Sequence, residues 1–400
     1  MQLVAYGAQD VYLTGNPQIT FFKVVYRRHT NFSMESIEQT FDGSAEYGRR
    51  VSCTISRNGD LISNMYLRCQ PNAAAGVDGK GPAGYNLISS ATLEIGGQQI
   101  DKHYGHWMNV WSMLSTPSAQ VKNLNTMTNS EATGNTAGSS KMLYVPFQFW
   151  FCRNPGLALP LIALQYHEVK LVVELAEGVN VAAADATGAR GWTSAPTLFV
   201  DYIYLDTDER RRFAQVSHEY LIEQLQFTGD EAGGSNKKHQ LNFNHPVKEL
   251  IWAQFNGNVE PTAARCSNVR LMLNGHDRFS ERDGTYFTNV QPWQHHTGCP
   301  MTLVRGAKGG LGRDVHHEGA AVHVYSFALK PEEHQPSGTC NMSRIDTAVL
   351  SMTSQGEVTT TTATYDAATD ATHLGTLCIY AVNYNVLRIM SGMGGLAYSN

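Results

Sequence analysis

The stretch Leu93-Glu94-Ile95-Gly96-Gly97 recurs in altered form as Leu271-Met272-Leu273-Asn274-Gly275, at an offset of 178 residues (275 − 97). A second pair, Pro155-Gly156 and Ser337-Gly338, each precedes a strand-like run, and its offset is 182 residues (338 − 156). Two matches at nearly the same offset predict a duplicated domain about 180 residues long.

Alternation with a period of two dominates the sequence around these matches. Residues 51–55 and 169–175 place apolar side chains on one face and polar side chains on the other, as in strands with one face in a core. Residues 198–205, 250–255 and 322–329 are apolar on both faces, which suits strands covered on both sides. Loops rich in Gly, Pro, Asn and Asp separate these runs. The pattern predicts an all-β protein made of sandwiches or barrels.

Helical signals are few. The best lies at residues 206–215, where Asp206 or Thr207 can cap the helix and Asp208 and Glu209 suit the positive end of its dipole. A second helix is predicted at residues 103–114. One stripe of that helix holds Trp107, Val110, Trp111 and Leu114. Long loops are expected at residues 177–196, 289–319 and 357–372.

Composition limits the classes of function. A chain of 400 residues suits two domains. Charged residues make up 16% of the chain, below the usual ~25%, which indicates that much of the surface is hidden in a core or against other subunits. The net charge is −5 and no long basic tail is present, so direct packaging of nucleic acid is not expected.

Cysteine usage and the lack of a targeting signal indicate the compartment. The seven cysteines include no CxxC pair, and an odd number argues against a disulfide framework or a structural zinc site. Residues 1–10 lack the features of a secretion signal, and apolar stretches such as residues 157–164 are far too short to span a membrane. We therefore expect synthesis in a reducing cytosol.

Several long segments resemble one family. The opening segment is QLVAYGAQDVYLTGNPQITFFK at residues 2–23. Two further segments are SRNGDL at residues 56–61 and LEIGGQQID at residues 93–101. Further matching segments are residues 154–169, 220–227, 335–341 and 383–396. Together they resemble the major capsid proteins of large double-stranded DNA viruses of algae, the phycodnavirus type.

This resemblance implies a complete architecture. It implies two tandem eight-stranded antiparallel jelly rolls with few short helices and long loops. The N-terminal arm would cover residues 1–20, the first jelly roll residues 21–210 and the second jelly roll residues 211–400. Loops at residues 256–268 and 289–319 depart from the family pattern, so glycan and host-contact sites are not carried over.

The resemblance also implies partners and a place. The protein would form a homotrimer whose six rolls mimic a hexagon, and such capsomers would tile an icosahedral shell in the virion. Neighbouring capsomers and minor capsid proteins beneath the shell would be its partners, and the internal membrane only an indirect one. Candidate core or interface anchors are Trp150, Phe151, Trp252 and Trp293.

No catalytic, cofactor-binding or metal-binding residue is predicted. His103 and His106 have HxxH spacing but lack the Glu and the i, i+4 geometry of a zinc protease helix. The glycine-rich residues 306–312 do not fit a phosphate loop, and residues 392–395 lack the helix that a dinucleotide site needs and are expected to form a close-packed tail. Loop histidines expected to be solvated are His295, His296, His316, His317, His323 and His334.

Other polar groups have plain structural explanations, and two rival functions stay open. The acidic cluster of Asp201, Asp206, Asp208 and Glu209 is explained by a capped helix start. Glycosylation sequons occur at Asn31 and Asn341.

An enzyme built on a sandwich would need a carboxylate pair or a metal site. A carbohydrate-binding module would need exposed aromatic side chains in a groove.

Overall fold

The structure is a computed structural model, and it describes most of the chain. The described residues are 7–17, 24, 26–71, 83–129, 141–177, 191–232, 237–255, 259, 261, 266–298, 322–354 and 376–398. The predicted loop at residues 357–372, the glycine-rich residues 306–312, and His316 and His317 lie outside these ranges.

The first half of the chain forms two antiparallel sheets. One contains β1 (Phe32–Gln39), β9 (Trp192–Leu205), β3 (Leu61–Pro71) and β6 (Leu143–Pro146) in that order, and the short β7 (Leu159–Pro160) pairs with β3. The other contains β2 (Arg50–Thr54), β8 (Val169–Leu175), β4 (Ile88–Ile95) and β5 (Gln98–Tyr104). We refer to these two sheets as the first roll.

The second half repeats this arrangement. One sheet contains β10 (His218–Ala232), β19 (Thr376–Met390), β12 (Pro246–Phe255) and β16 (His323–Ser326). The other contains β11 (Lys237–Gln240), β18 (Ala348–Ser354), β13 (Cys266–Leu273) and β14 (His276–Asp277). The short strands β15 (Arg282–Asp283), β17 (Cys340–Asn341) and β20 (Met393–Leu396) pair onto β13, β12 and β19. We refer to these sheets as the second roll.

The strand order confirms the duplication and the double jelly-roll fold. In each roll, the first long strand pairs with the last long strand, which in turn pairs with the third strand: β1, β9 and β3 in the first roll, and β10, β19 and β12 in the second. The repeated sequence motifs occupy equivalent hairpins, because Gly96 and Gly97 join β4 to β5 and Asn274 and Gly275 join β13 to β14. These four residues have positive φ angles of 59°, 82°, 51° and 77°, which two-residue hairpins favour. The expected count of eight strands per roll stays a prediction, because short strands add to the sheets.

The helices are few and short, as predicted. The described helices are α1 (Val11–Thr14), α2 (Ala83–Asn86), α3 (Gly105–Ser115), α4 (Ser118–Thr128), α5 (Trp150–Arg153), α7 (Thr207–Gln215), α8 (Gln291–His295), η1 (Pro155–Leu157), η2 (Tyr286–Val290) and η3 (Met342–Arg344). Among them, none is both long and apolar enough to cross a membrane. Asp206 caps α7 by accepting a hydrogen bond from the Thr207 amide, as expected.

Some predicted boundaries were wrong. Helix α3 begins at Gly105 rather than residue 103, because His103 and Tyr104 complete β5 and pair with β4. The predicted loop at residues 177–196 ends sooner, since β9 begins at Trp192. The strand predicted at residues 322–329 ends at Ser326.

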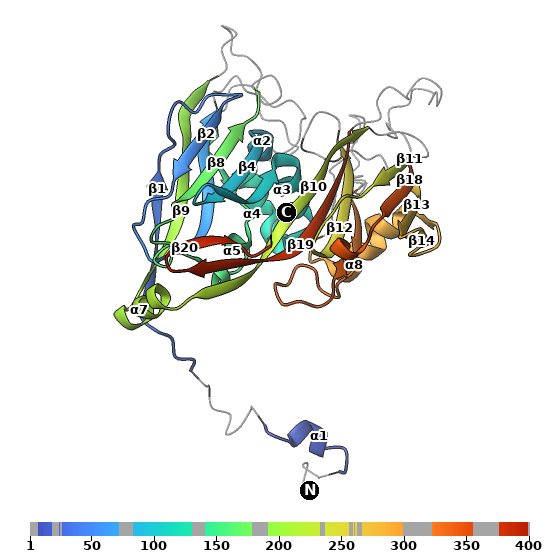
Figure 1. The fold of residues 1–400 in the computed structure, drawn as a ribbon, viewed down its shortest axis with the longest axis horizontal. Helices are drawn as coiled ribbons and strands as arrows, with labels where there is room; N and C mark the ends of the chain where they lie inside the picture. The colour runs from blue at the N-terminus through green and yellow to red at the C-terminus, as the bar shows by residue number, and fades with distance from the viewer. Residues whose placement is uncertain are drawn as a thin grey trace, which may run out of the picture.

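One hydrophobic core extends across both rolls. It contains the apolar faces of the first roll together with Ile251, Phe255, Val324 and Tyr380 of the second roll. Helix α3 lies between the rolls, next to β10 and β19, which cross the centre of the molecule (Figure 1). Its Trp107 is fully buried, with its ring centroid 5.0 Å from that of Tyr380. A smaller separate core fills the second roll alone.

Buried charges also join the two rolls. Glu223 on β10 accepts hydrogen bonds from Arg153 of α5 at 3.0 Å and from Lys248 of β12 at 2.8 Å. The Arg153 guanidinium stacks 4.1 Å from the ring centroid of Trp111 on α3. Burial by itself raises the pKa of Glu223, but contacts with His334, Lys248 and Arg153 outweigh it and lower the pKa to about 2. We call Arg153, Glu223 and Lys248 the seam cluster.

The substitution Trp107→Ala tests the shared core. Removing a fully buried indole from between the rolls leaves a cavity, and we expect a loss of ~3–5 kcal/mol of stability. Thermal unfolding followed by circular dichroism should show a clearly lowered Tm. The control Trp293→Ala removes an indole that is 82% exposed and should leave Tm nearly unchanged. Equal effects of the two substitutions would contradict the placement of α3.

The substitution Glu223→Gln tests the seam cluster. At neutral pH it leaves two buried cations without their anion, which costs ~3–5 kcal/mol. The stabilisation that ionised Glu223 gives to the wild-type fold is present above the ordinary carboxyl pKa of 4.5 and is lost as the pH falls through about 2. Tm measured from pH 7 to pH 2 should therefore converge for wild type and variant. The control is Glu219→Gln on the same strand, where the carboxylate is 60% exposed, and it should shift Tm little at any pH.

Candidate assembly surfaces

The N-terminal segment carries apolar side chains that the chain itself does not cover. Tyr12 and Leu13 of α1 are 90% and 84% exposed, and Val24 and Tyr26 further along are also exposed. In Figure 1, α1 lies well apart from both rolls. Exposed apolar side chains gathered in this way mark contacts with other molecules rather than a folded core.

Strand β1 carries exposed apolar side chains on the body of the molecule. It pairs with β9 along one edge and lies at the end of its sheet's strand order. Phe32 and Met34 on this strand are both about half exposed. An edge strand offers unpaired backbone groups as well as side chains to a neighbouring chain. Strand β1 is therefore a second candidate contact surface.

The four predicted anchor residues divide into core and surface. Trp150, Phe151 and Trp252 are buried and belong to the hydrophobic cores. Trp293 on α8 is instead exposed, and Leu329 on a neighbouring segment is exposed as well. The two segments are joined by the His295 ring, whose Nδ1 lies 3.0 Å from the Leu329 carbonyl oxygen. Trp293 and Leu329 form a third candidate contact surface.

The glycines at residues 392–395 form a close-packed tail, as predicted. Strand β20 turns back along β19 and lies against the first roll, where the Tyr166 amide donates to the Gly392 carbonyl oxygen at 3.0 Å. A Cβ atom on Gly394 would lie 2.5 Å from Leu164 Cδ2, so a larger side chain would push the strand away. We call residues 391–396 the C-terminal hook, and it is a further tie between the rolls.

The histidines of the HxxH motif have separate structural partners. His103 is buried, lies 2.9 Å from an Asp101 oxygen and stacks on Phe149. His106 contacts the Tyr380 hydroxyl across the seam, and burial lowers its pKa to about 4. A neutral ring suits its aromatic surroundings. In the described part of the chain, no cluster of His, Cys, Asp or Glu has the arrangement of a metal site.

The prediction of solvated loop histidines was wrong for His296 and His323, and it fails for His334 as well, whose side chain is only 18% exposed and faces Glu223. The side chain of His296 is fully buried between Glu249 and Glu332, with contacts of 3.0 Å to each. His323 is also buried, and its ring accepts from the Cys266 amide and stacks on Trp252. Burial alone would lower the pKa of His296, but Glu249 and Glu332 outweigh it and raise the pKa to about 9. Sequence spacing gave no signal for these partners.

The remaining polar candidates serve the fold. Asp206, Asp208 and Glu209 lie at the start of α7, as predicted, and Asp201 lies within β9. Asn31 is exposed just before β1. The side chain of Asn341 accepts a hydrogen bond from the Ser343 amide and so caps η3.

Two family models match nearly the whole chain. Residues 20–206 match the model described as "Major capsid protein N-terminus". Residues 209–305 and 317–395 match the model described as "Large eukaryotic DNA virus major capsid protein". The two models thus cover the first and the second roll in turn.

Individual relatives agree with the family models. The chain is 54% identical to the major capsid protein of Pyramimonas orientalis virus over 417 residues, covering 100% of this chain and 99% of that protein. It is 45% identical to the major capsid protein of Paramecium bursaria Chlorella virus 1 over 455 residues, again covering 100% and 99%.

Solved structures share the architecture. A quasi-atomic model of the PBCV-1 virus capsid superposes with a TM-score of 0.81 at 41% identity, covering 95% of this chain and 100% of that one. The Faustovirus major capsid protein shares the fold alone, with a TM-score of 0.72 at 12% identity and coverage of 96% and 94%. With the duplicated rolls and the matches across both of them, the chain belongs to the family of major capsid proteins of large eukaryotic DNA viruses.

Proposed function

We propose that this chain is a structural subunit of an icosahedral virus shell and that it assembles as a homotrimer. The observation that carries the proposal is the fusion of two rolls with the same strand order through one shared core. Three such chains bring six rolls of similar shape into one ring, which is the geometry of a pseudo-hexagonal capsomer. Capsomers of this shape tile a surface against their neighbours.

The division of the chain follows the same logic. We place the arm at residues 1–20, the first roll at residues 21–210 and the second roll at residues 211–400. In support, the strands before α7 build the first two sheets and the strands after it build the other two. Helix α7 is the connector, and Arg210 ties it to Asp60 of the first roll at 3.0 Å.

Each candidate contact surface can be assigned to one of the proposed partners. Closing a trimer buries on the order of 2,000 Å² per pair of subunits, and that surface is largely apolar in obligate assemblies. Strand β1 and the Trp293–Leu329 surface fit this role. The arm with α1 fits contacts with minor capsid proteins beneath the shell. A net charge of −5 suits neither direct binding of nucleic acid nor direct contact with an anionic internal membrane.

A structural role without catalysis completes the proposal. The relatives are capsid proteins, and the buried ionisable groups at the seam are paired with one another rather than aimed at a substrate. The protein would be made in the host cytoplasm and would reside in the virion.

Native mass spectrometry of the purified chain tests the oligomer. We expect a species of three chains that persists on dilution, because an obligate interface of this size dissociates slowly. Negative-stain images should show uniform discs with six lobes. A monomer at all concentrations, or a monomer that binds sugar saturably, would contradict the capsomer.

The double substitution Tyr12→Ser with Leu13→Ser tests the arm. We expect the trimer to form normally, because α1 lies apart from both rolls, while incorporation into complete shells falls at least about tenfold through lost apolar contacts. Shell yield is measured by gradient sedimentation of virions or assembled particles. The control Thr14→Ala on the same short helix should assemble as the wild type does. Normal shells from the double variant would remove the arm from the assembly contacts.

A further inference from the structure

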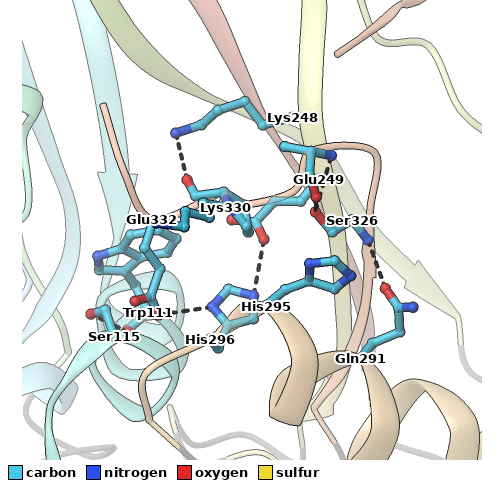
Figure 2. A network of polar contacts seen from close by, with 12 residues as sticks. Trp111, Ser115, Lys248, Glu249, Gln291, His295, His296, Ser326, Lys330 and Glu332 are labelled. Atoms are coloured by element: carbon cyan, nitrogen blue, oxygen red, sulfur yellow. Dashed lines mark hydrogen bonds and ion pairs between the residues drawn. The ribbon is translucent and has the colours of Figure 1, made fainter. Parts of the chain in front are cut away.

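A buried ionic triad joins three separate segments of the second roll (Figure 2). His296 follows α8, Glu249 belongs to β12, and Glu332 lies between β16 and β17. The imidazole is 0% exposed, with Nε2 3.0 Å from Glu249 Oε2 and Nδ1 3.0 Å from Glu332 Oε1. We call these three residues the His296 triad.

The triad needs a proton on both ring nitrogens. A neutral imidazole that donates from Nδ1 to Glu332 would present a lone pair to the Glu249 carboxylate, only 3.0 Å away. The Glu249 carboxylate is fully buried, and in the described part of the chain its oxygens have no hydrogen-bond donor other than the His296 ring. Its charge is therefore balanced by the imidazolium alone, and loss of that proton leaves a buried anion without compensation.

The surrounding charges do not replace His296. Lys248 is committed to Glu223 and to the Pro331 carbonyl oxygen, at 2.8 and 2.6 Å. Lys330 pairs with Glu333 at the surface, and the His295 ring is turned to the Leu329 carbonyl. Charged and titratable groups on the described elements around the triad include Arg153, Glu223, Lys248, His295, Lys330, Glu333, His334 and Tyr384, together with His323 and Tyr325 of β16. The three carboxylates Glu223, Glu249 and Glu332 are matched by Arg153, Lys248 and His296 only while His296 is charged.

The triad is connected to the first roll. Directly after His296, the Thr297 amide and hydroxyl both donate to Glu332. The Gly298 amide then donates to the Leu114 carbonyl oxygen, near the end of α3, at 2.7 Å. A Cβ atom on Gly298 would lie 2.4 Å from the Met113 carbonyl oxygen, so the segment passes very close to the helix. In Figure 2, Trp111 and Ser115 of α3 lie on the other side of the triad from Glu249.

We propose that the His296 triad is a proton-dependent clasp that holds residues 327–337 and α8 against the seam between the rolls. In alkaline solution His296 loses its proton, Glu249 and Glu332 repel each other, and residues 327–337 are released together with the exposed Leu329. The clasp is a property of the single chain, so it does not depend on the proposed trimer.

The sign of the pH dependence follows from the two partners. The pKa of His296, about 9, lies above its ordinary value of 6.5. The stabilisation that protonated His296 gives to the fold is therefore complete below pH 6.5 and is lost as the pH rises through about 9. For Glu332, burial raises the pKa, but hydrogen bonds from His296 and Thr297 outweigh it and lower the pKa. Its contribution is thus present above pH 4.5 and is lost as the pH falls through the lowered value. The clasp is closed at neutral pH.

Hydrogen–deuterium exchange of the full-length protein from pH 6 to pH 10 tests the clasp. Protection factors, corrected for the intrinsic rate at each pH, are compared for residues 327–337 and for strand β8 of the first roll. We expect protection of residues 327–337 to fall at least about tenfold with a midpoint near pH 9, while β8 stays protected. A flat profile, or a midpoint at or below pH 7, would overturn the proposal.

Matched variants separate the clasp from general alkaline loosening. His296→Gln should show low protection of residues 327–337 already at pH 7 and little further change up to pH 10. His295→Gln removes the neighbouring ring, which contacts the Leu329 carbonyl oxygen but is not part of the triad. It lowers protection of residues 327–337 by a similar factor at every pH and should keep the wild-type midpoint. If both variants behave alike, the triad is not the clasp. Should His296→Gln fail to fold, the wild-type profile and Glu332→Gln, which should lower the midpoint by removing one carboxylate charge, still decide the matter.

Discussion

The shared apolar layer between the rolls is the constraint on which the rest of the structure depends. Helix α3 extends from the first roll and buries Trp107 against Tyr380 of β19, and residues of β12 and β16 complete the same core. A jelly roll usually closes its core between its own two sheets. Here one roll finishes its core with side chains from the other, so the two rolls pack as one body.

Polar contacts fix the orientation that the apolar layer permits. Apolar surfaces tolerate sliding, because their attraction has no preferred direction. The seam cluster and the His296 triad do not tolerate such sliding, because a displaced partner leaves a charge buried without compensation. Gln224 of β10 also donates to the Ile100 carbonyl oxygen of β5, which pins the two sheets at their edges. A repeated tile needs a constant angle between its halves, and these directional contacts provide it.

Local patterns predicted much of this fold from the sequence. Alternation located most long strands, the turn glycines located the repeated hairpins, and Asp206 located the start of α7. Helix α4 was missed, because its polar residues 118–128 show no apolar stripe and bury almost nothing. The burial of His296 could not be foreseen, since Glu332 lies 36 residues away and Glu249 on another strand. Pairings of this kind depend on which segments the topology brings together.

The C-terminal hook has a consequence for the order of events during synthesis. Strand β20 is the last described strand, yet it closes onto residues 164–167 of the first roll, a segment that Arg57 holds by its carbonyl oxygens. The first roll can fold while the ribosome is still translating the second. The contact between the C-terminal hook and the first roll can form only after β20 has left the ribosome. A chain that lacked this strand would leave the backbone of residues 164–167 uncovered and would lose one of the ties between the rolls.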